Sequence, residues 1–180
     1  MIKLRKAILL MLLYFPGVLF AQNGDEEVLD WNANRKLTWA DYKATPNPDS
    51  DAAATTTTYL KIEYNIRSNN FSFKIQSKFS KSRSWGLHKS AYILSHEQGH
   101  FDIAEIFARK LNKEMSNYQF NNKTFQKELK EIYNNVIDEK TEMQNDYDRE
   151  TNHSINKEKQ EKWNRKIVML LEELKEYAVY

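Results

Sequence analysis

The chain has no cysteine, no internal repeat and, outside its first 21 residues, no excess of basic residues. Without cysteine, disulfide bonds are excluded, so an exported form must be stabilised by packing and by any metal ion that it binds. Removing residues 1–21 takes 3 of the 27 lysines and arginines and none of the 25 acidic residues, which leaves 24 against 25. A net charge of about −1 does not indicate binding to nucleic acid or to an acidic membrane surface.

The chain also lacks an apolar run long enough to span a lipid bilayer, which requires about 20 residues. A basic cluster at residues 3–6 precedes an apolar segment at residues 7–20, and Ala21 follows. This order is typical of a secretory signal peptide. We therefore expect a signal peptide at residues 1–21, a single mature domain at residues 22–180, and a secreted or periplasmic protein without a stable membrane anchor.

Two runs of alternating apolar and polar residues predict a β-hairpin in the first half of the mature chain. The alternation begins after residue 55 and is interrupted at residues 68–70 by residues that favour a turn. The apolar positions of the two runs define one buried face; they are Leu60, Ile62, Tyr64, Ile66, Phe71, Phe73 and Ile75.

From residue 89 the apolar period becomes helical. It predicts three helices, near residues 90–118, 124–146 and 156–177. The Lys/Glu-rich stretch at residues 157–162 is interpreted as a solvated helix face. The predicted fold class is therefore α+β, with a small antiparallel sheet followed by a helical part.

The first predicted helix contains His96-Glu97-Gln98-Gly99-His100, which is an HExxH motif. Helical residues four apart lie about 40° apart on one face and one turn apart, so both imidazoles can reach one zinc ion. Glu97 borders that face and can accept a proton from an activated water without being a ligand. A closed structural zinc site has no use for such a carboxylate, so Glu97 favours an enzyme over a structural site.

A catalytic zinc site generally has three protein ligands and one open position, so His96 and His100 leave one ligand to be found. Glu105 lies about 160° round the helix from the metal and is expected to pair with Arg109 instead. Asp102 also points away from the metal. His88 lies two turns from His96 on the same chain segment, where ligation of the same ion is difficult.

The remaining histidine, His153, lies between the second and third predicted helices, where the chain must turn. We predict that His153 is the third ligand, with Asp148 or Glu150 as alternatives. Tyr147 in the same segment can donate a hydrogen bond to the oxyanion of a tetrahedral intermediate. It can equally be an aromatic residue that anchors the end of a helix.

Together these segments resemble a family of predicted secreted zinc-dependent proteases of bacteria, long classed as a domain of unknown function. The resemblance rests on the segments Leu37–Tyr42, His96–Glu105 and Tyr147–His153 and on the hairpin. It implies a zincin-like arrangement, bacterial export and proteolysis. Members of that family often carry glycine after the last histidine, where this chain has Ser154.

The expected activity is hydrolysis of an amide bond with Zn²⁺ held by His96, His100 and His153, Glu97 as the general base and Tyr147 as the oxyanion donor. The expected partner is a peptide or protein substrate, which a sheet edge could hold by strand addition. Two alternatives remain. One is a non-catalytic exported binding module with structural or vestigial zinc, and the other is an amidase that acts on cell-wall amides.

Overall fold

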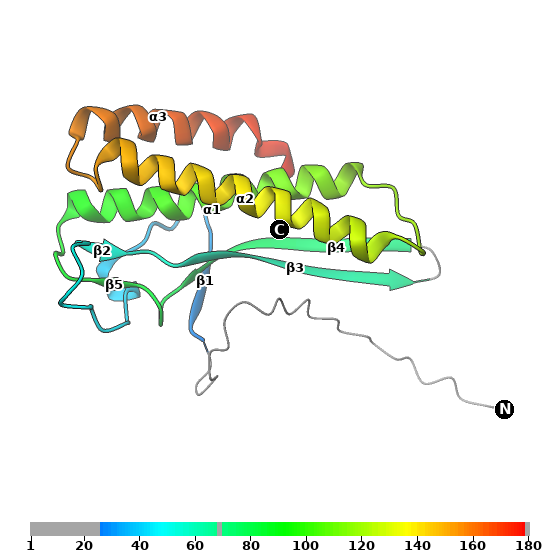
Figure 1. Ribbon diagram of the computed structural model, residues 1–180, viewed down its shortest axis with the longest axis horizontal. Coiled ribbons are helices and arrows are strands. Elements are labelled where there is room, and N and C mark those ends of the chain that lie inside the picture. Colours follow the sequence, from blue (N-terminus) through cyan, green and yellow to red (C-terminus); the bar gives the residue numbers. More distant parts are fainter. Residues whose placement is uncertain (1–25, 68–69, 179–180) are drawn as a thin grey trace.

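The computed structural model describes residues 26–67 and 70–178 (Figure 1). The signal peptide that the sequence predicts at residues 1–21 lies outside these ranges. Within them, no helix combines the length and the apolar character that crossing a membrane requires.

The predicted hairpin is confirmed. Strands β3 (Thr58–Arg67) and β4 (Asn70–Ser80) pair antiparallel, and Ile62 lies opposite Ile75. A third strand, β1 (Val28–Asp30), pairs with the other edge of β4, which gives the order β1-β4-β3. Two-residue strands β2 (Ala54–Thr55) and β5 (Trp85–Gly86) form a separate pair. The sequence did not predict β1, β2 or β5, because alternation cannot be recognised in two or three residues.

Three helices follow the sheet, so the α+β fold class is confirmed. Helix α1 (Ala91–Asn117) begins after Ser90, whose side chain accepts a hydrogen bond from the Ile93 N–H. Helix α2 (Phe125–Thr151) and helix α3 (Lys157–Glu173) complete the set, with short 3₁₀ turns at Trp39–Asp41 (η1) and Lys175–Tyr177 (η2). All three helices lie on one side of the sheet, with α1 next to the strands and α3 farthest from them (Figure 1).

Helix α2 extends five residues beyond its predicted end at residue 146. The last turn stays helical because Tyr147 and Thr151, four residues apart, are both fully buried and continue the inward face of the helix. As a result, Tyr147, Asp148 and Glu150 lie on a helix, whereas the sequence had placed them in a turn.

The core has two parts. The larger lies between the sheet and the three helices and includes Leu60, Ile75, Leu111 and Trp163. The smaller holds the aromatic segment near the start of the chain, where Leu37 and Tyr42 pack with Phe79 and Phe101.

The expected pair between Glu105 and Arg109 is also buried, with Arg109 Nε 2.7 Å from Glu105 Oε1. The Arg109 guanidinium also donates a hydrogen bond to the carbonyl of Leu171, in the last turn of α3, and so joins α1 to α3.

Candidate metal centre

The residues of the HExxH motif lie on the first half of α1. They contact the loop that precedes β3 and the helices α2 and α3. His96 and Glu97 are buried, with 3% and 4% of their surfaces exposed, and His100 is half-buried. The two imidazole rings lie side by side, with centroids 4.9 Å apart. The helical spacing therefore brings both rings to one face, as the sequence predicted.

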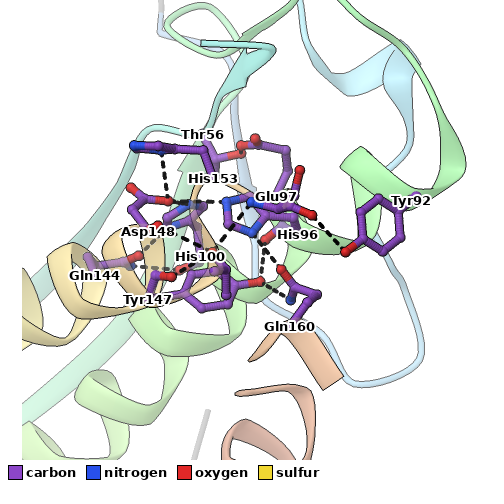
Figure 2. Close-up of polar contacts among 12 residues, drawn as sticks. Thr56, Tyr92, His96, Glu97, His100, Gln144, Tyr147, Asp148, His153 and Gln160 are labelled. Atoms are coloured by element: carbon purple, nitrogen blue, oxygen red, sulfur yellow. Dashed lines mark hydrogen bonds and ion pairs between the residues drawn. The ribbon is translucent and has the colours of Figure 1, made fainter. Parts of the chain in front are cut away.

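Asp148, from the last turn of α2, lies over that face (Figure 2). Its Oδ1 atom is 3.1 Å from His96 Nε2 and 3.0 Å from His100 Nε2. One donor atom from each of these three residues lies within 4.8 Å of the others, so the group could hold a metal ion. The sequence had named Asp148 only as an alternative to His153.

His153 lies beside this group rather than within it. Its Nδ1 is 3.6 Å from Asp148 Oδ1, and 69% of its side chain is exposed. It belongs to a run of three non-glycine residues with left-handed backbone, Asn152, His153 and Ser154, whose φ angles are 48°, 50° and 74°. This turn places the ring next to the Asp148 carboxylate immediately after α2 ends.

The Nδ1 atoms of the two motif histidines face glutamine side chains. His96 Nδ1 is 2.8 Å from Gln160 Oε1, and His100 Nδ1 contacts Gln144 Oε1. Gln144 Nε2 also donates to the backbone carbonyl of His100 at 2.9 Å. Each ring is thus held on the side opposite Asp148 by an amide, one from α2 and one from α3.

Tyr147 is fully buried behind the motif. Its ring stacks on His96 with centroids 4.5 Å apart, and its hydroxyl donates to the His96 carbonyl at 3.1 Å. The same hydroxyl accepts a hydrogen bond from Gln160 Nε2 at 2.6 Å. A Cβ atom on Gly99 would lie 2.3 Å from this hydroxyl oxygen, so α1 and α2 approach each other closely only because residue 99 is glycine.

Glu97 is held from the opposite side, by the loop between β2 and β3. Thr56 Oγ1 donates to Glu97 Oε2 at 2.6 Å (Figure 2). Tyr42 Oη lies 2.7 Å from the same Thr56 oxygen. Burial, with a smaller effect from the Glu97 charge, raises the pKa of Tyr42, so this hydroxyl stays protonated. Because the Thr56 proton is directed to the carboxylate, Tyr42 must be the donor to Thr56.

The charges at the centre are coupled. Burial alone would raise the pKa of Asp148, but hydrogen bonds from His100 and His96 outweigh it and hold the pKa well below its usual range. Burial alone would lower the pKa of His100, but Asp148 outweighs it and the net shift is upward. A positive charge between the carboxylate and the imidazoles is therefore favoured, whether it is a proton or a metal ion.

The other carboxylates that the sequence considered face elsewhere. Asp102 accepts from Trp31 Nε1 at 2.7 Å and pairs with Lys36, and Glu150 accepts from Trp163 Nε1 at 3.1 Å. His88 is exposed, as expected. These contacts direct Asp102 away from the two motif histidines, and they place Glu150 against α3.

A family model described as "Bacterial protein of unknown function (DUF922)" matches residues 21–154, which are 134 of the 180 residues. The chain belongs to the DUF922 family. No curated protein and no solved structure matches the chain. The DUF922 match includes the HExxH motif, Asp148 and His153, but it ends before α3, which supplies Gln160. The description of DUF922 assigns no activity to its members.

Sequence reasoning missed three residues of this site: Thr56, Gln144 and Gln160. Gln160 lies in the stretch that was interpreted as a solvated helix face, yet it is only 1% exposed. A signal for its burial was present, because Gln160 precedes the buried residues Trp163 and Ile167 by three and seven positions. Gln144 precedes the buried residues Tyr147 and Thr151 of α2 by the same spacings, whereas Thr56 had no comparable signal.

Proposed function

We propose that the protein is an exported zinc-dependent hydrolase that cleaves peptide bonds. The supporting observation is that Asp148 Oδ1 lies 3.0–3.1 Å from Nε2 of both motif histidines, with Glu97 next to His96 on the same helix. Two imidazole nitrogens and one carboxylate oxygen are a donor set that suits catalytic zinc and leaves one position open for water or substrate. Export rests on the order of charged and apolar residues at positions 1–21.

In this proposal His96, His100 and Asp148 would hold the zinc. The bound ion would supply a water molecule with a pKa near neutrality and would polarise the substrate carbonyl. Glu97 would be the general base, which would take a proton from the attacking water and deliver it to the leaving amine. The hydrogen bond from Thr56 to Oε2 of Glu97 holds the carboxylate in position for this role.

Two residues take different places from those that the sequence suggested. We assign the third ligand to Asp148, while ligation by His153, whose ring lies 3.6 Å from Asp148 Oδ1, stays a prediction. An oxyanion donor must face the reacting carbonyl, but the Tyr147 hydroxyl donates to the His96 backbone. We therefore assign Tyr147 to holding His96 in position.

The test is metal analysis of the mature protein, followed by digestion of a peptide library and of cell-wall fragments. Glu97→Gln keeps the size of the side chain but cannot accept the proton, so hydrolysis should fall by about two to four orders of magnitude while zinc stays bound.

Three other outcomes would contradict parts of the proposal. Zinc without cleavage of either substrate by the parent would indicate a structural site. Cleavage of cell-wall fragments alone would indicate an amidase. Loss of zinc from the Glu97→Gln variant would make Glu97 a structural element.

A further inference from the structure

The two motif histidines are each held on the Nδ1 side by a glutamine amide, and the orientation of both amides can be deduced. A glutamine side chain has an oxygen that only accepts hydrogen bonds and a nitrogen that only donates them. Which of the two faces a ring nitrogen decides whether that nitrogen carries a proton. The remaining partners of each amide settle this question.

For His100 the orientation of the glutamine amide follows in one step. Gln144 contacts two groups of the same residue, the Nδ1 atom and the backbone carbonyl. A carbonyl oxygen can only accept, so the Gln144 nitrogen must be the group that faces it, at 2.9 Å. The Gln144 oxygen then faces His100 Nδ1, which must carry the proton of that hydrogen bond.

For His96 the deduction needs one more step, through the Tyr147 hydroxyl. The Tyr147 hydroxyl has a single proton, which it donates to the His96 carbonyl at 3.1 Å. It must therefore accept from Gln160, so Gln160 Nε2 faces Tyr147, at 2.6 Å, and Oε1 faces His96 Nδ1, at 2.8 Å. Gln160 Nε2 also lies 2.8 Å from Asn164 Oδ1, an acceptor, which agrees with this orientation.

We propose that Gln144 and Gln160 are positioning residues that keep Nδ1 of His100 and His96 protonated, so that Nε2, the nitrogen that faces Asp148, is the one that would bind a metal ion. Each does so through a hydrogen-bond path that ends on the backbone carbonyl of the histidine it controls. The metal part of this inference rests on the proposed function, whereas the protonation of Nδ1 does not. Because Gln160 lies on α3, the C-terminal helix is part of the metal centre although the family match ends at residue 154.

The protonation can be read directly in metal-free protein with ¹⁵N-labelled histidine, near pH 8, by long-range ¹H–¹⁵N correlation. In the parent, Nδ1 of both His96 and His100 should be protonated. Gln160→Leu removes the acceptor, so His96 should shift its proton to Nε2, beside Asp148, while His100 is unchanged. Gln144→Leu should have the reciprocal effect, and Gln160→Glu, which keeps an acceptor oxygen, should leave His96 as in the parent.

Zinc affinity, measured by competition with a chromophoric chelator, provides the second readout. Residues that orient a metal ligand typically contribute a factor of about 10–100 in affinity, and we expect that loss for Gln160→Leu and Gln144→Leu. Gln98→Leu is the matched control, because Gln98 lies on α1 and forms hydrogen bonds with Leu37 N and Asp102 instead of a histidine ring. The zinc affinity of this variant should equal that of the parent.

An unprotonated Nδ1 in the parent, or an unchanged His96 in Gln160→Leu, would overturn the inference. So would leucine variants that bind zinc as tightly as a zinc-binding parent, although the proposed function would then stand. A parent that does not bind zinc would overturn the proposed function and the metal part of the inference. The ¹⁵N measurement would still decide whether the glutamines control Nδ1.

Discussion

Asp148 and His153 are the two residues that can complete the site beside His96 and His100. Asp148 contacts both rings, whereas His153 contacts only Asp148 and is mostly exposed. Asp148→Ala should therefore weaken zinc binding by more than about 100-fold, beyond the effect of a group that only orients a ligand, and His153→Ala by about 10-fold. Chelator competition measures both values. The reverse ranking would return the third position to His153.

Ser154 adopts a backbone conformation that glycine tolerates better. Its φ angle is 74°, and left-handed backbone costs an L-residue about 1–2 kcal/mol. Ser154→Gly should raise the free energy of unfolding by about 1 kcal/mol, measured by urea denaturation. Ser154→Ala retains the Cβ atom and should give no gain. A glycine variant that is no more stable than the alanine variant would show that this turn is not strained.

At the residue scale, spacing was sufficient to predict that the imidazoles of His96 and His100 share one face, because the geometry of a helix fixes how residues four apart are arranged. It was not sufficient for Asp148, whose placement depends on α2 continuing past residue 146. The glutamines could not be recognised as partners of the histidines, since helical spacing indicates at most that an amide is buried and only tertiary contacts show which group it bonds.

Among the elements, the contact between α1 and α2 depends on Gly99. Replacing glycine by alanine within a helix normally stabilises it by about 1 kcal/mol. At residue 99 the added methyl group would lie 2.3 Å from the Tyr147 hydroxyl oxygen, so we expect Gly99→Ala to destabilise the protein by about 1–3 kcal/mol.

Urea denaturation again gives the measurement. Ser95→Ala, on the exposed side of the same helix, serves as the control and should change stability by no more than about 0.5 kcal/mol. A Gly99→Ala variant as stable as the parent would mean that α2 can move away from α1 without loss.

The elements differ in how far the sequence determined them. The hairpin was predictable because one buried face requires strict alternation, and the bulky residues on that face fix the register. For α1 the apolar residues of the sequence indicated a helix, and its buried residues extend from His96 to Met115. The end of α2 was not predictable, because Asp146 to Glu150 are mostly charged and only the burial of Tyr147 and Thr151 shows that the helix continues.

For the molecule as a whole, a metal ion would join α1 to the end of α2 in a protein without disulfide bonds. Zinc at 100 times its dissociation constant should stabilise the fold by about 2.7 kcal/mol, which corresponds to a rise in Tm of about 5–10 °C. A thermal melt with zinc, and a second melt after EDTA, measures this shift. His100→Ala should show little response, and an equal response in that variant would place the bound zinc elsewhere.

A proton can take the place of a metal ion in this site. Against the opposing effect of burial, Asp148 shifts the pKa of His100 upward, so a positive charge between the carboxylate and the rings is favoured. On the proposed function, zinc uptake would exchange one cation for another and would release protons to the solvent. The heat of binding should accordingly vary with the ionisation enthalpy of the buffer. An acidic environment would therefore release a bound ion, while the side chains of the site would keep the positions in which they can bind another.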